Sequence, residues 1–182
     1  QADPTGEILA RNTVGDRGYG TTTDRYKLTT NDAGLVEVTL GTTQRLFVPL
    51  DEGGYAEYSF GHGTLAASDG GYLLTEMDGT TGFFGGDGLL AYTEDSAGRR
   101  TQYEYSGEQL SRLVHPDGST TEFTYDGSLL TQITYPDGRQ ETFEYDDDKH
   151  LVRGTDTVGR VVEVTHGGEG VPEHAVANMH LD

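Results

Sequence analysis

Carboxylates are the most abundant chemically reactive side chains in this sequence. Aspartate and glutamate together number 31, against 12 lysines and arginines. Pairs of glutamates such as Glu104 and Glu144 could act as general acid and base, as carboxylates do in glycoside hydrolysis. Both fall on the polar side of an expected strand, however, where a solvated face explains them more simply. We therefore predict no catalytic residue among them and expect that the protein is not an enzyme.

The acidic run Asp146-Asp147-Asp148 is the strongest candidate for binding a metal ion. Hard oxygen ligands of this kind suit calcium. No spaced pattern of further ligands follows the run, so a solvated turn is the preferred interpretation. The glycine-rich stretch 82–89 resembles a calcium-binding β-roll turn, but it occurs once and not in tandem. We predict no cofactor and no metal site, with weak calcium binding as the alternative.

Other side chains that carry chemistry do not form a recognisable constellation. The six histidines are His62, His115, His150, His166, His174 and His180. None has a second histidine four residues away with a glutamate between them, which argues against a metal-dependent hydrolase. The sequence also has no Gly-x-Ser-x-Gly nucleophile elbow, no phosphate-binding loop and no cysteine.

A repeat in the sequence indicates the elements that would position these residues. Two series of aromatic residues advance by 20 positions, namely Tyr103, Phe123, Phe143 and Tyr105, Tyr125, Tyr145. A turn signal precedes each unit, at Gly98, at Asp117-Gly118 and at Asp137-Gly138. A fixed period in this range indicates an array whose units bury their apolar faces against their neighbours. We predict that both aromatic series form the core of the array, since sugar stacking is a less simple explanation of inward-facing rings.

Each unit has the pattern of a β-hairpin. In the unit that begins at Asp117, alternation places Phe123 and Tyr125 on one face of a strand and Thr124 on the other. Asp126-Gly127-Ser128 then makes a tight turn, with glycine supplying the positive φ. A second strand returns over 129–135. The sequence therefore predicts an all-β, open-ended array of repetitive hairpins, a spiral or solenoid-like sheet.

The array has weaker copies of the unit before its centre and different segments at both ends. We assign 1–34 to an N-terminal lead-in or joint segment, 35–166 to the hairpin array and 167–182 to a C-terminal tail. The tail fits either a short helix near 173–179 or a free strand. In the copy that starts at Asp78, Gly86 stands where an aromatic is expected, which predicts a hole in the core pattern.

These residues resemble the Rhs, or YD-repeat, proteins. The resemblance is carried by Tyr72-Leu73-Leu74-Thr75, Asp78-Gly79-Thr80, Phe84, Gly88-Leu89-Leu90, Asp95, Gly98-Arg99, Tyr103-Glu104-Tyr105 and the name-giving pairs Tyr125-Asp126 and Tyr145-Asp146. It extends over about 36–165. It implies a spiral of hairpins that forms a hollow shell, in which the repeats are scaffold and activity resides in terminal domains. The sequence shows neither a recognisable toxin domain nor the C-terminal self-cleavage motif of that family.

Charge and hydropathy limit the partners. A net charge of -19 argues against nucleic acid and anionic membranes, and no window reaches the roughly 18 apolar residues of a spanning helix. We expect a secreted or cell-surface, non-catalytic structural protein. It would associate end to end through exposed strand edges into a filament or sleeve, or be a segment of a larger Rhs-type shell. The alternative is an adhesion or carbohydrate-binding module that uses surface tyrosines such as Tyr19 or Tyr55 and binds glycans or other cell-surface components.

Overall fold

The protein was studied as a computed structural model. The structure describes residues 14–15, 18–19, 25–41, 43–58, 62–168 and 171–181, and the side chains of 26–40, 43–58 and 62–164 within these ranges. The chain divides into two compact units, one formed by 24–120 and the other by 1–23 together with 121–182. Each unit is described separately below.

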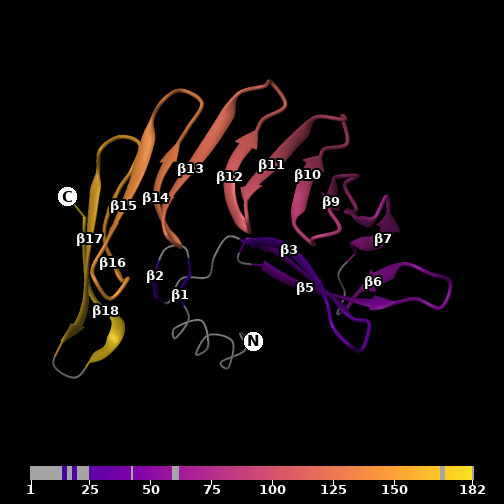
Figure 1. Cartoon of the computed structure of the whole chain (residues 1–182), viewed down its shortest axis with the longest axis horizontal. Coiled ribbons are helices and arrows are strands. Elements are labelled where there is room, and N and C mark those ends of the chain that lie inside the picture. The colour runs from indigo at the N-terminus through magenta and orange to yellow at the C-terminus, as the bar shows by residue number, and fades with distance from the viewer. Residues whose placement is uncertain are drawn as a thin grey trace. The chain divides into compact units, whose positions relative to one another are not determined.

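The unit of residues 24–120 is an antiparallel meander, in which each strand pairs with the next one along the chain (Figure 1). Its strands are β3 (Arg25–Thr30), β4 (Val36–Gly41), β5 (Thr43–Pro49), β6 (Tyr55–Glu57), β7 (Thr64–Ser68), β8 (Gly71–Thr75), β9 (Thr81–Phe84), β10 (Leu90–Glu94), β11 (Arg100–Ser106) and β12 (Gln109–Val114). Pro49 is the last residue of β5. It thus occupies a strand end, where its missing N–H costs no ladder hydrogen bond.

The second unit continues the same arrangement. Its strands are β13 (Thr120–Asp126), which begins at the last residue of the first unit, β14 (Leu129–Thr134), β15 (Gln140–Tyr145), β16 (Leu151–Thr155), β17 (Val161–Gly168) and β18 (Val171–Leu181), with the separate two-stranded hairpin β1 (Val14–Gly15) and β2 (Gly18–Tyr19). The C-terminal segment is therefore a strand paired with β17, and the short helix considered for 173–179 is wrong. Residues 1–13 of the expected lead-in segment lie outside the described residues.

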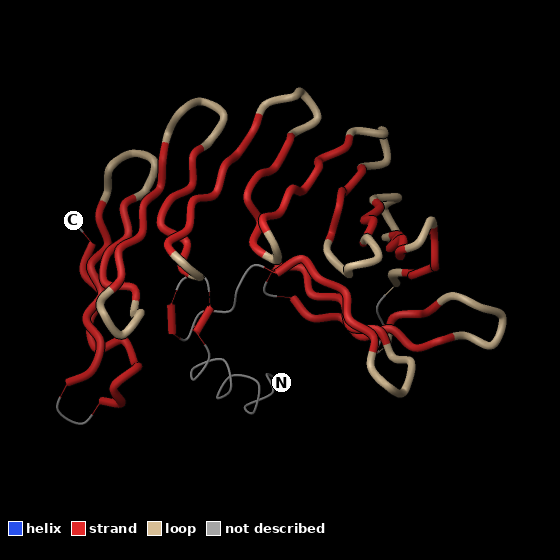
Figure 2. Tube along the Cα trace, in the orientation of Figure 1, coloured by secondary structure: helices blue, strands red, loops and turns tan. Residues whose placement is uncertain are grey.

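Every regular element in the described part of the chain is a strand (Figure 2), which confirms the all-β hairpin array. Within those residues, no helix has the length and apolar character needed to cross a membrane.

Two kinds of turn alternate along the hairpins. The first is a five-residue loop in which the first N–H donates to the fifth carbonyl and the fourth N–H donates to the first carbonyl. Such loops start at Asn31, Leu50, Glu76, Gly85, Asp95, His115, Tyr135, Asp146 and Asp156. The fourth residue has a positive φ and is glycine in every case except Lys149, at 67°. This is the geometry of a type I turn followed by a glycine bulge.

The second kind of turn has two residues and closes the opposite end of a hairpin. Gly107 and Gly127 open two such turns with φ values of 64° and 56°. They link the paired residues Ser106–Gln109 and Asp126–Leu129. Glycine in the first position with positive φ is typical of a type II′ turn, whose twist matches that of the strands. The tight turn expected at 126–128 is confirmed.

A β-bulge recurs at the same place in each of the three regular 20-residue repeats. The register shifts between Glu104 and Tyr105, between Thr124 and Tyr125, and between Glu144 and Tyr145. The unpaired residues on the returning strands are Ser111, Thr131 and Val152. The Ser111 hydroxyl donates to the Glu104 carbonyl at 3.0 Å, and the Thr131 hydroxyl donates to the Thr124 carbonyl at 3.1 Å. Each hydroxyl thus ties its bulge to the facing strand.

The most deeply buried side chains lie in the unit of 24–120. They are Leu28, Val36, Val38, Phe47, Leu65, Leu74, Phe84 and Leu90, and they form one hydrophobic cluster. In the other unit the buried side chains are Leu130, Ile133, Thr121 and His150. The main core is therefore built by residues that precede the regular aromatic series.

Candidate functional site

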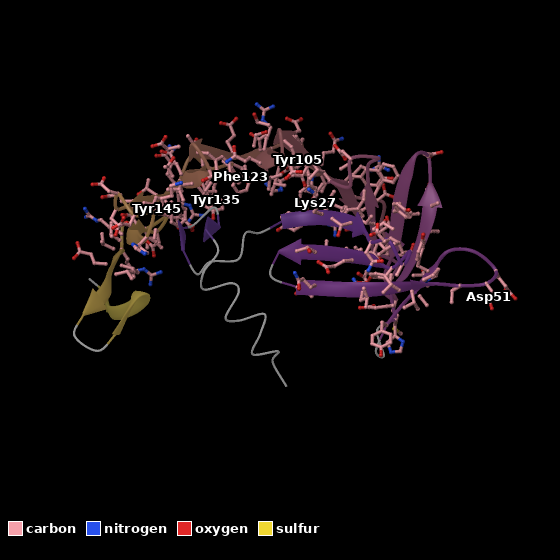
Figure 3. All side chains as sticks on the ribbon, turned by 60° about the horizontal axis from the view of Figure 1, so that its bottom comes forward. Lys27, Asp51, Tyr105, Phe123, Tyr135 and Tyr145 are labelled. Atoms are coloured by element: carbon pink, nitrogen blue, oxygen red, sulfur yellow. The ribbon has the colours of Figure 1, made fainter. Side chains whose placement is uncertain are left out.

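The aromatic repeat positions occupy one face of their strands. All six residues of the two series are half-buried, whereas the glutamates and threonines between them on β11, β13 and β15 are mostly exposed. Tyr103 packs against the main cluster and contacts Tyr26, with 5.2 Å between the ring centroids. Tyr145 donates its hydroxyl to the Leu130 carbonyl at 2.7 Å. Figure 3 locates Tyr105 in one unit and Phe123 and Tyr145 in the other. A continuous column of these rings remains a prediction.

The turn aspartates use their carboxylates to hold the backbone. In the loop that ends at Ser119, Asp117 Oδ1 accepts the Ser119 N–H at 3.0 Å and its hydroxyl at 2.6 Å. Asp137 Oδ1 accepts the Arg139 N–H at 3.1 Å. The hydroxyl of Ser119 lowers the pKa of Asp117, and the backbone N–H of Arg139 lowers the pKa of Asp137. Donors of this kind favour the charged form of each carboxylate and hold the loop together.

A second version of the loop starts with the aspartate. Asp95 Oδ1 accepts the N–H groups of Ala97 at 2.9 Å and Arg99 at 3.0 Å, and Asp95 Oδ2 contacts the Arg99 side chain at 2.7 Å. Asp146 binds His150 in the same manner, with 2.8 Å to its N–H and 3.1 Å to Nδ1. The first aspartate of the acidic run therefore serves its own turn. In the described part of the chain, no group of three or more histidine, aspartate or glutamate side chains could hold a metal ion.

The glutamates considered as an acid–base pair are exposed and lie beside arginines. Glu104 Oε2 is 3.4 Å from Arg112 Nη1, and Glu144 Oε1 is 3.8 Å from Arg153 Nη1. Each contact joins neighbouring strands of one hairpin. Ion pairs this exposed contribute little to stability.

An ion cluster that the sequence did not reveal lies between β5, β6 and the loop after β8. Arg45 donates to both oxygens of Glu57 at 2.8 and 2.7 Å and also binds Glu76, and the Gly63 N–H donates to Glu57 Oε2 at 3.1 Å. The side chains of Arg45 and Glu57 are 14% and 13% exposed. The hydrogen bond from Arg45 lowers the pKa of Glu57, and its bonds to both glutamates raise the pKa of the guanidinium.

The geometry explains why this cluster escaped the sequence analysis. Arg45 and Glu76 are separated by 31 positions, with no motif between them. A guanidinium placed between two carboxylates suits a structural cross-link between strands better than proton transfer.

Two sequence-based interpretations need correction. Tyr55 is half-buried against the main cluster and Tyr72, with 6.0 Å between ring centroids, so it is not a surface tyrosine. Gly86 lies in the loop after β9 rather than in a strand, so it leaves no hole in the core. Phe84, just before that loop, is completely buried. The side chain of Tyr19 lies outside the described residues.

Together these features define a class of protein, an array of antiparallel β-hairpins with standardised turns and half-buried aromatic faces. A family model described as RHS repeat matches residues 106–140. The match confirms the resemblance to the Rhs/YD-repeat family over this part of the chain. No curated protein matches the chain.

Proposed function

We propose that this chain is a non-catalytic structural protein, secreted or located at the cell surface, whose hairpins form a wall and join neighbouring repeats through a strand edge. The observation that carries the proposal is the unbroken strand order of the main sheet, in which the strands from β3 to β18 follow one another in sequence order. Rhs repeat proteins are generally found at the cell surface or secreted, which supports the location in general terms.

The polar groups of the array support a structural role. The turn carboxylates bind N–H groups of their own loops, and the cluster of Arg45, Glu57 and Glu76 cross-links strands. A catalytic carboxylate has to remain available to a substrate. These side chains instead act on the scaffold itself.

The edge of β18 supports an association between copies or a continuation into further repeats. β18 is the last strand in the sheet order and pairs with β17 on one side. A strand edge with unpaired backbone groups is a template for another strand. The neighbour would be a second copy of this chain or a further repeat of a longer Rhs-type shell.

Analytical ultracentrifugation and negative-stain electron microscopy of the purified chain test the proposal. We expect species larger than a monomer, and we expect a peptide of residues 171–181 to compete and reduce their size, whereas a scrambled peptide leaves them unchanged. A monomer at every protein and salt concentration would refute self-association. Turnover in a broad hydrolase screen would refute the non-catalytic role.

A further inference from the structure

The loop of residues 85–89 differs from the other loops of its type in composition but not in geometry. Its hydrogen bonds, Gly85 N–H to the Leu89 carbonyl and Gly88 N–H to the Gly85 carbonyl, are both 2.9 Å, as in the loop that starts at His115. That loop needs a single glycine, Gly118, whereas the loop 85–89 has three. The turn itself therefore does not require the additional glycines.

The backbone of β3 gives a second reason, besides the positive φ, why residue 88 is glycine. The Leu28 N–H donates to the Gly88 carbonyl at 2.7 Å, and Lys27 forms an isolated antiparallel bridge with Leu89. A Cβ atom at Gly88 would lie 2.3 Å from the Leu28 carbonyl oxygen. At the equivalent Gly118, with φ of 82° against 78° at Gly88, a Cβ atom would meet nothing within 4 Å. Because Gly88 has no side chain, the backbone of β3 can approach the loop this closely.

Side chains of β3 reach three further places in the same unit. Leu28 is 5% exposed and belongs to the core cluster with Phe84 and Leu90. Tyr26 contacts Tyr103 of β11. Lys27, labelled on β3 in Figure 3, has its Nζ 2.6 Å from Oε1 of Glu108 in the turn between β11 and β12. A backbone bond, an apolar contact, a ring contact and an ion pair thus act together on one short strand.

We propose that the loop 85–89 is a strand-docking site that receives β3 and closes the N-terminal edge of the array. The inference rests on the proposed function in one respect: it implies that a neighbouring copy associates through the edge of β18 and not through that of β3. An edge strand attracts another chain through its outward N–H and C=O groups. On β3 the Leu28 N–H is already bonded, and Gly88 occupies the space beside it. Copies would then meet in pairs through β18 and would not grow at both ends into a filament.

Hydrogen exchange at the Leu28 amide tests the docking directly. We compare Gly88→Ala with the matched control Gly118→Ala, because both place alanine at the same positive φ and only the first clashes with Leu28. In the wild type we expect Leu28 to be protected. In Gly88→Ala its exchange should accelerate by at least about tenfold relative to Gly118→Ala, since β3 must move away.

A milder variant covers the case in which Gly88→Ala does not fold. Lys27→Met removes only the ion pair to Glu108 and should accelerate Leu28 exchange by about threefold, the size expected for one partly exposed pair. The docking is refuted if wild-type Leu28 exchanges as fast as exposed loop amides. It is equally refuted if the two glycine variants have the same effect on Leu28, or if Lys27→Met has none where Gly88→Ala cannot be measured.

Sedimentation of the same proteins separates this inference from the proposed function. We expect the wild type to stop at pairs and Gly88→Ala to form larger species, because a second edge opens. A wild type that stays monomeric but protects Leu28 would leave the docking intact and refute self-association. Filaments of a wild type with a protected Leu28 would refute the restriction to β18.

Discussion

At the scale of single residues, the carboxylates of this acidic chain act mainly on the backbone that carries them. Asp95 is representative, because its Oδ1 accepts two N–H groups of its own loop while Oδ2 pairs with Arg99. The backbone bond and then the side-chain bond from Arg99 lower the pKa of Asp95. The ionised carboxylate of Asp95 thus strengthens the hydrogen bonds that hold its own loop.

Asp95→Asn and Asp95→Ala separate the charge of this side chain from its role as an acceptor. Because the folded-state pKa lies below the unfolded value of about 3.9, the charge stabilises the fold above that pH and its contribution is lost as the pH falls through the folded-state pKa. Asn keeps an acceptor, so its melting temperature should fall below that of wild type at pH 7 and match it near pH 2. Ala should be lower at both pH values. Thermal unfolding followed by circular dichroism from pH 7 to 2 measures this, and an Asn variant that matches wild type throughout would contradict it.

Lys149 occupies a position that the loop geometry reserves for glycine. Its φ of 67° lies in the left-handed region, where the other eight loops of this type have glycine. A side chain there costs about 1–2 kcal/mol, part of which glycine returns as greater freedom of the unfolded chain. Lys149→Gly should therefore raise the free energy of unfolding by about 0.5–1 kcal/mol, as measured by urea denaturation.

A matched change gives the Lys149 prediction its control. Gly118→Lys introduces the same side chain at a φ of 82° in an open loop. It should lower the free energy of unfolding by a similar amount. If both changes shift stability in the same direction, backbone strain is not the cause.

At the scale of the hairpin, the bulge before each repeat tyrosine contains one unpaired residue on the returning strand. That residue carries a hydroxyl in some hairpins and not in others. Thr131 bonds across its bulge, and Val152 occupies the corresponding place in the next hairpin. Thr131→Val should lower the free energy of unfolding by about 1 kcal/mol, the net value of one hydrogen bond, and Val152→Thr should raise it by up to the same amount. Denaturant unfolding measures both. If both substitutions changed the free energy of unfolding in the same direction, the hydroxyl hydrogen bond would be excluded as the cause.

The hairpins were predictable from the sequence because they depend on short-range patterns. Alternation around Phe123 and Tyr125, together with the glycine at 127, predicts a strand, a turn and a second strand, as the structure has them. The bulges were not predictable from the sequence. The unpaired residue Thr131 is of a type common in strands, and its position depends on the register of the partner strand.

Other features were less predictable because they require contacts between distant positions. The binding of Arg45 to Glu76 spans 31 residues, and the close approach of Leu28 to Gly88 spans 60. Gly86 was interpreted as a missing aromatic because the repeat period was extended into a loop. Departures from a repeat therefore point to tertiary contacts that the period cannot describe.

At the scale of the whole molecule, charge opposes the packing that the hairpins achieve. A chain of 182 residues with a net charge of -19 repels itself in the folded state and also repels a second copy. Screening shortens the reach of that repulsion from about 10 Å at 0.1 M ionic strength to about 3 Å at 1 M. Only exposed carboxylates without nearby cations contribute strongly, since many of the others lie beside arginines in the described hairpins.

Salt should therefore stabilise both the fold and any association between copies. Raising NaCl from 0.05 to 1 M should increase the melting temperature, by about 2–4 °C for each kcal/mol of repulsion removed, and should shift sedimentation toward larger species. Choline chloride at equal ionic strength should have the same effect, because screening does not depend on the identity of the cation. Millimolar calcium should add nothing beyond its ionic strength if the turn aspartates serve only their loops. A sharp calcium-specific rise would instead show a cation site, and a melting temperature that falls with NaCl would show that the surface ion pairs outweigh the repulsion.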